Sequence, residues 1–320
     1  MVDRIVKTGV VGVGKMGINH ARIYSELPNS VLVGVYDIDL KVAEYCANLY
    51  GCRAYSTLKE FLRSGVEAVS VAVPTSFHAE IALELLEHGI NVLVEKPIAA
   101  TIDDALEMIR IAESCNLKLM VGHVERFNPV VQAIKSIIKN DDIISVNMIR
   151  VGPKPPRIKD TGVIVDMAIH DIDLIRYVTN QEIKNVYCVS RADFSAFEDS
   201  ASILIETEGG IGVQLTVNWV TPYKAREIQI VTSSQLIRAN LLTQHAQSIK
   251  QHSIDESSYI IRDLYVQYRE PLREQLKAFL KAIQYDQIPP VTGRDGLQAL
   301  EIALRATNCD THIHYSPVKT

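Results

Sequence analysis

The chain lacks the sequence features of membrane and nucleic-acid-binding proteins. No apolar run approaches the roughly 18 residues that a membrane-spanning helix needs. The first 17 residues contain no h-region of a signal peptide, because a short apolar stretch runs directly into glycines. Basic residues show no excess, since 33 Lys and Arg stand against 38 Asp and Glu, for a net charge of -5. We therefore expect a cytoplasmic protein without a membrane or nucleic-acid partner.

Cysteine is scarce and unpaired in its spacing. The chain has five cysteines, an odd number, and no two of them form a CxxC pair: Cys46, Cys52, Cys115, Cys188 and Cys309. This pattern favours buried free thiols over a disulfide framework. His312 and His314 form the one HxH pair, and without nearby ligand residues they do not predict a metal site.

The first 122 residues alternate between two hydrophobic periods. Of the 320 residues, 47% are hydrophobic and 22% charged, which is typical of a globular protein of about two domains. Short β-branched runs predict strands at Ile5–Val11, Val31–Tyr36, Ala68–Val73, Asn91–Val94 and Lys118–Val121. Helical patterns separate them, at Met16–Leu27, Leu40–Tyr50, Thr57–Arg63, Phe77–His88 and Ile102–Cys115. This alternation predicts an α/β fold with a doubly wound parallel sheet over residues 1–122.

The pattern of residues 123–320 is different, because strands follow one another directly. Strands are predicted at Ile143–Val151, Ile183–Arg191, Ala201–Thr207, Ile211–Trp219, Arg226–Thr232 and Leu236–Leu241. Helices are predicted at Val165–Val178, Pro271–Tyr285 and Arg294–Asn308. This order predicts a C-terminal α+β domain with a large, mostly antiparallel open sheet. Several strands carry apolar residues on both faces, so we expect a homodimer or homotetramer formed through this sheet.

A glycine-rich turn follows the first predicted strand. Gly12, Gly14 and Gly17 fit GxGxxG, with Lys15 and Met16 between them. In this context the glycines permit a tight turn, the approach of a pyrophosphate and close helix–strand packing. Asp37 ends the second strand, where its carboxylate can accept ribose hydroxyls and would repel a 2′-phosphate. The motif predicts a dinucleotide site that prefers NAD to NADP.

Polar residues also follow the other strands of the first half. Pro74-Thr75 follows the third predicted strand, Glu95-Lys96-Pro97 the fourth and His123 the fifth. Ligands of open parallel sheets bind beyond the carboxyl ends of the strands, so all of these residues belong to one edge. The alternative for Glu95 and Lys96 is a solvated pair before a turn.

One helix of the second half carries a polar stripe. Asp166, His170 and Asp173 lie at i, i+4 and i+7 on an otherwise apolar helix. A polyhydroxyl ligand would explain them. A helix-dipole acid followed by a solvated stripe would explain them equally well.

In this order, the segments resemble the glucose–fructose oxidoreductase/inositol 2-dehydrogenase (Gfo/Idh/MocA) family over essentially the whole chain. Glu95-Lys96-Pro97 and Asp166-x-x-x-His170 carry the resemblance most specifically. It implies an N-terminal Rossmann domain, a C-terminal domain whose open sheet commonly forms the oligomer interface, and hydride transfer between NAD and a hydroxyl. The catalytic lysine would fall on Lys96, the catalytic histidine on His170 and the substrate-orienting aspartate on Asp166. The residues expected to contact the cofactor are Gly12, Gly14, Lys15, Met16, Gly17, Asp37, Pro74, Thr75, His78, Glu95 and Lys96.

The substrate expected from the resemblance is a polyol, sugar or sugar nucleotide. The segment 122–129, Gly-His-Val-Glu-Arg-Phe-Asn-Pro, is similar to the branch that acts on UDP-N-acetylhexosamines at C3. The chain departs from many members because Asp160-Thr161-Gly162, and not consecutive glycines, precedes the helix with His170. Besides Lys96, Asp166 and His170, Arg157 is expected to bind substrate. The loop Pro153–Arg157 and the cluster Tyr223–Arg226 offer cations that could hold a nucleotide diphosphate, and an exposed basic loop is the alternative for both.

Two assignments of the proton acceptor are open. A general base should have a pKa near the working pH, and the unperturbed pKa is about 6.5 for histidine and about 10.4 for lysine. This favours His170 as base and the Lys96 cation as stabiliser of a developing oxyanion. The reverse assignment would require burial to lower the pKa of Lys96. Two further functions compete with a dehydrogenase: an NAD-retaining, redox-assisted glycoside hydrolase and a non-catalytic NAD-binding regulator.

Overall fold

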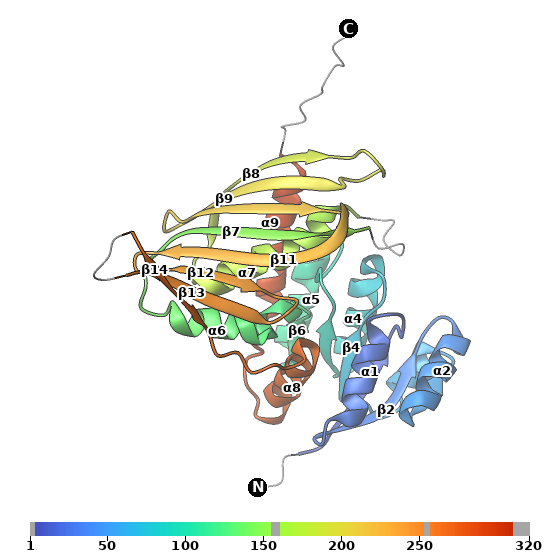
Figure 1. The fold of residues 1–320 in the computed structure, drawn as a ribbon. Coiled ribbons are helices and arrows are strands. Elements are labelled where there is room, and N and C mark those ends of the chain that lie inside the picture. Colours follow the sequence, from blue (N-terminus) through green and yellow to red (C-terminus); the bar gives the residue numbers. More distant parts are fainter. Residues whose placement is uncertain (1–3, 155–160, 253–256, 310–320) are drawn as a thin grey trace, which may run out of the picture. The chain divides into compact units, whose positions relative to one another are not determined.

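The computed structural model describes residues 4–154, 161–252 and 257–309 (Figure 1). The chain divides into two compact units. One comprises Met1–Val124 with Glu270–Gln298, and the other comprises Glu125–Arg269 with Ala299–Thr320. Within the described ranges, no helix combines the length and apolarity needed to cross a membrane.

The first unit contains a six-stranded parallel sheet in the order β3-β2-β1-β4-β5-β6. Its strands are β1 (Val6–Val11), β2 (Ser30–Tyr36), β3 (Arg53–Tyr55), β4 (Ala68–Val71), β5 (Asn91–Val94) and β6 (Leu119–Val121). Its connecting helices are α1 (Gly17–Glu26), α2 (Leu40–Tyr50), α3 (Leu58–Leu62), α4 (His78–Glu87) and α5 (Ile102–Ser114). The strand order reverses between β1 and β4, so the crevice that binds ligands in such sheets lies at their carboxyl ends. The predicted doubly wound parallel sheet is confirmed.

Local sequence signals set the limits of these helices. Asp39 caps α2 by accepting a hydrogen bond from the Lys41 amide, and Gly51 ends the helix with a φ of 67°. Thr101 caps α5 in the same way through the Asp104 amide. The four residues of β4 are all buried and apolar or small, as expected for a strand covered on both faces.

A late segment of the chain returns to the first unit. Helix α8 (Pro271–Gln284) is joined to α1 by the ion pairs Arg22–Glu270 and Arg273–Glu26. The Val121 amide donates a hydrogen bond of 3.1 Å to the Val291 carbonyl. The sequence predicted 123–320 as one continuous second domain, whereas Glu270–Gln298 groups with the first unit.

The second unit contains an eight-stranded, mostly antiparallel sheet in the order β14-β13-β12-β11-β7-β10-β9-β8. Its strands are β7 (Ile143–Pro153), β8 (Ile183–Arg191), β9 (Ser200–Thr207), β10 (Gly212–Asn218), β11 (Val220–Thr232), β12 (Leu236–Asn240), β13 (His245–Gln251) and β14 (Tyr259–Asp263). Only the β7–β10 pair is parallel among these neighbours. This is the large open sheet that the sequence predicted.

One face of this sheet is covered by helices (Figure 1). Apolar residues of α6 (Pro129–Ile137), α7 (Ile169–Thr179) and the end of α9 (Gly293–Thr307) share one core with alternate residues of the strands. The residues between them point to the opposite face. There Tyr187, Leu204 and Ile261 are half or more exposed, and no helix of the described part of this unit covers them.

Candidate functional site

The glycine turn between β1 and α1 has the geometry of a phosphate-binding turn. Gly12 has a φ of 81°, and a Cβ there would lie 2.9 Å from the Ala72 backbone. A Cβ on Gly17 would lie 1.8 Å from the Gly12 carbonyl oxygen. A Cβ on Gly14 would meet nothing within 4 Å, and Gly14 and Lys15 are exposed. The turn is therefore tight at both ends and open in the middle, where a pyrophosphate can approach the backbone and the N-terminus of α1.

Asp37, which directly follows β2, is hydrogen-bonded to this turn. Its Oδ2 accepts a hydrogen bond of 2.8 Å from the Val13 amide, and its Oδ1 accepts one of 3.0 Å from the Asp39 amide. Each carboxylate oxygen keeps a second lone pair, so the group can still accept ribose hydroxyls. The carboxylate is fixed in place by main-chain donors, and the turn and Asp37 together fit an adenine dinucleotide.

Glu95 and Lys96 follow β5 at the same edge of the sheet. The fully buried His20 of α1 donates from Nε2 to Oε1 of Glu95 at 3.1 Å. Burial alone would raise the pKa of Glu95, but the hydrogen bond from His20 and the charge of Lys96 hold it below its ordinary value. A Cβ on Gly122 would lie 2.9 Å from Oε1, so the glycine after β6 makes room for this carboxylate. Glu95 is therefore a positioned carboxylate beside Lys96, and the solvated-pair alternative does not describe it.

His78 braces two strand ends. It is buried, with Nδ1 2.8 Å from the Pro97 carbonyl and Nε2 3.0 Å from the Val73 carbonyl. Burial lowers the pKa of His78 although both carbonyls oppose this shift. Both ring nitrogens face main-chain oxygens, so His78 ties the end of β4 to the Lys96–Pro97 segment.

In the second unit, Asp166 and His170 lie on either side of a change in helix type. Asp166 belongs to a π-helical turn, Ile164–Ala168, and His170 to the first turn of α7. Such turns occur frequently at functional sites. Glu198 shapes the entry to this turn, since its Oε1 accepts from the Ile164 amide at 3.1 Å. A Cβ on Gly162 would lie 2.0 Å from the same oxygen, so this position requires glycine. The contact explains why one glycine stands here although the chain lacks the consecutive glycines of many family members.

The third member of the predicted stripe has a structural role. Asp173 is 1% exposed and receives two hydrogen bonds from Arg126, at 2.8 and 2.6 Å. It is a buried ion pair and not a ligand-binding carboxylate. The polar stripe therefore reduces to Asp166 and His170, which are both half-buried.

A second buried ion pair joins the sheet to α7. Arg150 of β7 is 2% exposed and donates to Asp171 at 2.7–2.9 Å, and to Glu125 at 3.0 Å. Burial alone would lower the pKa of Arg150, but the two carboxylates raise it above its usual value. Glu125 and Arg126 of the segment 122–129 are thus engaged inside the second unit. Sequence reasoning missed His20, which holds Glu95, and Glu198, which holds the turn with Asp166. It also missed Arg150 as the counter-ion of Asp171.

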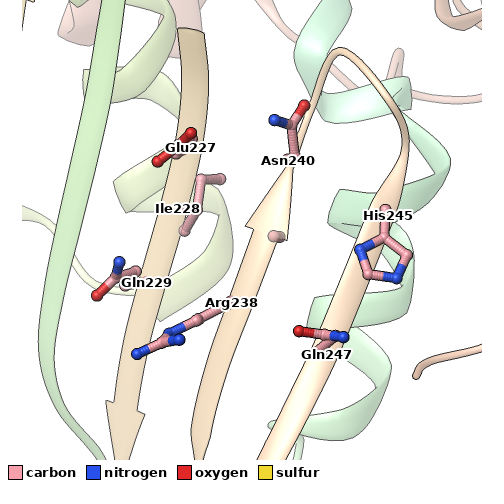
Figure 2. Close-up of a pocket in the computed structure, with 8 residues that line it drawn as sticks. Glu227, Ile228, Gln229, Arg238, Asn240, His245 and Gln247 are labelled. Carbon is pink, nitrogen blue, oxygen red and sulfur yellow. The ribbon is translucent and has the colours of Figure 1, made fainter. Parts of the chain in front are cut away.

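A shallow polar hollow of about 160 Å³ lies elsewhere, on the sheet of the second unit (Figure 2). Its polar side chains come from β11, β12 and β13: Glu227, Gln229, Arg238, Asn240, His245 and Gln247. None of the predicted site residues belongs to it. Arg157, expected to bind substrate, and the pair His312 and His314 lie outside the described residues. Within the described part of the chain, no cluster of histidine, cysteine or acidic residues could hold a metal.

The comparison with protein families gives two matches. Residues 6–123 match the model of the oxidoreductase family with an NAD-binding Rossmann fold, and residues 132–238 match the GFO/IDH/MocA C-terminal domain. UDP-N-acetylglucosamine 3-dehydrogenase of Acidithiobacillus ferrooxidans is 32% identical over 225 residues, which cover 70% of this chain and 71% of that protein.

The chain belongs to the Gfo/Idh/MocA family of oxidoreductases. The scyllo-inositol 2-dehydrogenase (NAD(+)) of Bacillus subtilis is 28% identical over 327 residues, which cover 96% of this chain and 94% of that protein. A solved structure of the A. ferrooxidans UDP-N-acetylglucosamine 3-dehydrogenase superposes with a TM-score of 0.89 at 27% identity, covering 95% of this chain and 96% of that one. The family resemblance and the fold expected from the sequence are confirmed. The roles of individual site residues stay predictions.

Proposed function

We propose that this member of the family is an NAD-dependent dehydrogenase that oxidises a secondary hydroxyl of a sugar nucleotide, with a UDP-N-acetylhexosamine at C3 as the first candidate. The observation that carries the proposal is the carboxyl edge of the parallel sheet. There the open glycine turn follows β1, the fixed Asp37 carboxylate follows the adjacent β2, and the Glu95-Lys96 segment follows β5 of the same sheet.

In this proposal the first unit holds the cofactor. The amides of the turn at Gly14 and the N-terminus of α1 bind the pyrophosphate, and Asp37 accepts the adenosine ribose hydroxyls. A 2′-phosphate would meet the charge of Asp37, so NAD is the proposed cofactor and NADP the disfavoured one. When bound, the nicotinamide supplies a hydride acceptor.

In this proposal the side chains accept the proton of the substrate and stabilise the developing negative charge. His170 accepts the proton of the substrate hydroxyl, and Asp166 accepts a hydrogen bond from a second hydroxyl and orients the sugar. The Lys96 ammonium donates to the oxygen that becomes the carbonyl and stabilises its negative charge. Glu95 lies next to Lys96 in the chain and carries the negative charge that its lowered pKa maintains.

The choice of substrate rests on the relatives. The 32% identity and the TM-score of 0.89 both involve the A. ferrooxidans UDP-N-acetylglucosamine enzyme. An inositol is the second candidate, because the scyllo-inositol 2-dehydrogenase aligns over 96% of this chain. The test is NADH formation with matched panels of UDP-N-acetylhexosamines, aldoses and inositols. Turnover of the UDP-sugars supports the proposal, and turnover of inositols alone selects the second candidate. Glycoside cleavage without net NADH, or NAD binding with no turnover, would contradict both.

We also propose that the protein forms a homodimer or homotetramer through the uncovered face of the eight-stranded sheet. Leu204 is 54% exposed there and lies directly across the strand pair from Tyr187, which is 61% exposed. Leu204→Glu should shift the molecular mass measured by light scattering toward the monomer. Leu106→Glu, at a 48% exposed position on α5, is the matched control and should leave the mass unchanged. Assembly unaffected by Leu204→Glu would place the interface elsewhere.

A further inference from the structure

Arg226 is a half-buried cation on the helix-covered face of the second sheet. It shares the phase of Ile228 and Ile230, which are buried in the core of this unit. It belongs to β11, which begins at Val220, so the predicted cluster lies on a strand, where Lys224 is exposed and Arg226 is half-buried. Its guanidinium therefore lies among the polar groups of α7 and β7 and not on the open face.

Arg226 stands directly opposite another arginine. In the β7–β11 pair its register partner is Arg150. Like charges directly opposite each other destabilise a strand pair. Arg150 is compensated by hydrogen bonds to Asp171 and Glu125. These contacts leave Arg226 as the under-compensated member of the pair.

The hydrogen bonding of Arg226 also shows that its charge is under-compensated. Within the described ranges, its Nη1 atom is buried and has no hydrogen-bond partner. Burial and the Arg150 charge lower the pKa of Arg226 to about 10, against the attraction of Glu125, Asp171 and Asp166. The group stays protonated at neutral pH, and its buried Nη1 donor is unmet. An unmet buried donor is costly, and such costs are retained chiefly where a ligand meets them.

We propose that Arg226 is the anion-binding group of the substrate site, donating through its guanidinium to a phosphate or carboxylate oxygen of the sugar substrate. Asp166 interacts electrostatically with Arg226 from the π-helical turn. In this proposal Asp166 accepts a hydrogen bond from a hydroxyl of the ligand, and Arg226 donates hydrogen bonds to an oxyanion of the same ligand. A guanidinium binds an oxyanion through two parallel N–H groups, which also fixes its orientation. This inference rests on the proposed function, because it names the charge that the substrate carries.

The test compares charged and neutral probes by isothermal titration calorimetry. The affinity for uridine diphosphate is compared with that for uridine, to test recognition of a phosphate. The affinity for D-glucuronate is compared with that for D-glucose, to test recognition of a carboxylate. Wild type should prefer the charged member of at least one pair, and Arg226→Gln should reduce that preference about tenfold or more. Arg226→Lys should retain part of it. Arg238→Gln, which removes the same charge from the opposite face of this sheet, should leave it unchanged.

The melting temperature of the ligand-free protein provides a second measurement. If Arg226 is kept for a ligand, Arg226→Gln should maintain or raise this temperature, because it removes an under-compensated buried charge. A clear fall would show a structural role and overturn the proposal. Wild type without a preference for either charged probe, or Arg226→Gln with an unchanged preference, would overturn it as well. Binding is measured without hydride transfer. Retained anion binding in a protein that reduces no NAD would therefore contradict the proposed function alone.

Discussion

Gly14 provides a direct test of the dinucleotide site. A Cβ added there meets no protein atom within 4 Å, and its φ lies outside the left-handed range. Gly14→Ala should therefore fold normally, with a melting temperature within about 2 °C of wild type, since exposed substitutions seldom exceed ~0.5 kcal/mol. In the proposed complex the new methyl group would occupy the space through which the pyrophosphate reaches the backbone. The loss of one charge-assisted amide hydrogen bond, about 1.5–3 kcal/mol, should weaken NAD binding about tenfold to a hundredfold.

The measurement is calorimetric titration of NAD into purified protein. Gly212→Ala is a matched control, because a Cβ there also meets nothing within 4 Å and the residue begins β10 of the second unit. It should change neither stability nor NAD affinity. Wild-type affinity in Gly14→Ala would show that no pyrophosphate lies over this turn, and the cofactor assignment would be wrong.

Three further predictions concern charge and proton transfer. Asp37→Asn removes the charge facing a 2′-phosphate and should lower the preference for NAD over NADP about tenfold in kcat/KM; an unchanged preference would place the discrimination elsewhere. Lys96→Met and His170→Asn should each lower kcat by about 100-fold to 10,000-fold while the Kd for NAD is preserved, and near-normal turnover of either variant would remove its assigned role. The lowered pKa of Glu95 means that its carboxylate stabilises the fold above about pH 4.3 and loses this contribution as the pH falls through the folded-state pKa. Glu95→Gln should therefore melt below wild type at pH 7, with the difference closing in acid; a gap independent of pH would refute this reasoning.

The sequence predicted the architecture because hydrophobic periodicity is strong in both halves. It missed β3, since three residues are too few to show a period. It also missed β13 and β14, because β13 alternates small and polar residues around Ala246 and Ser248, and β14 is exposed along its whole length. The helix α6 was overlooked although Asn128 and Pro129 form a normal helix start, with Asn128 accepting from the Val130 amide.

At the site, sequence predicted residue types better than their partners. The spacing of Asp166, His170 and Asp173 predicted one polar stripe. In the structure Asp173 forms a buried ion pair with Arg126, which no local pattern predicts. Arg150 left a usable signal, because it shares the phase of the buried Val146 and Met148 along β7. What the phase cannot supply is its counter-ion, since Asp171 lies on a helix after the strand. Long-range charge pairs of this kind depend on the tertiary fold.

The central claim is hydride transfer from a secondary carbinol carbon of the substrate to bound NAD. The most direct measurement uses substrates deuterated at that carbon, beginning with UDP-N-acetylglucosamine deuterated at C3. The reduced cofactor is then analysed by mass spectrometry. The account predicts that deuterium appears in the nicotinamide, with a slowed rate of NADH formation. Reduced cofactor without deuterium, or substrate conversion without any reduction of NAD, would contradict it.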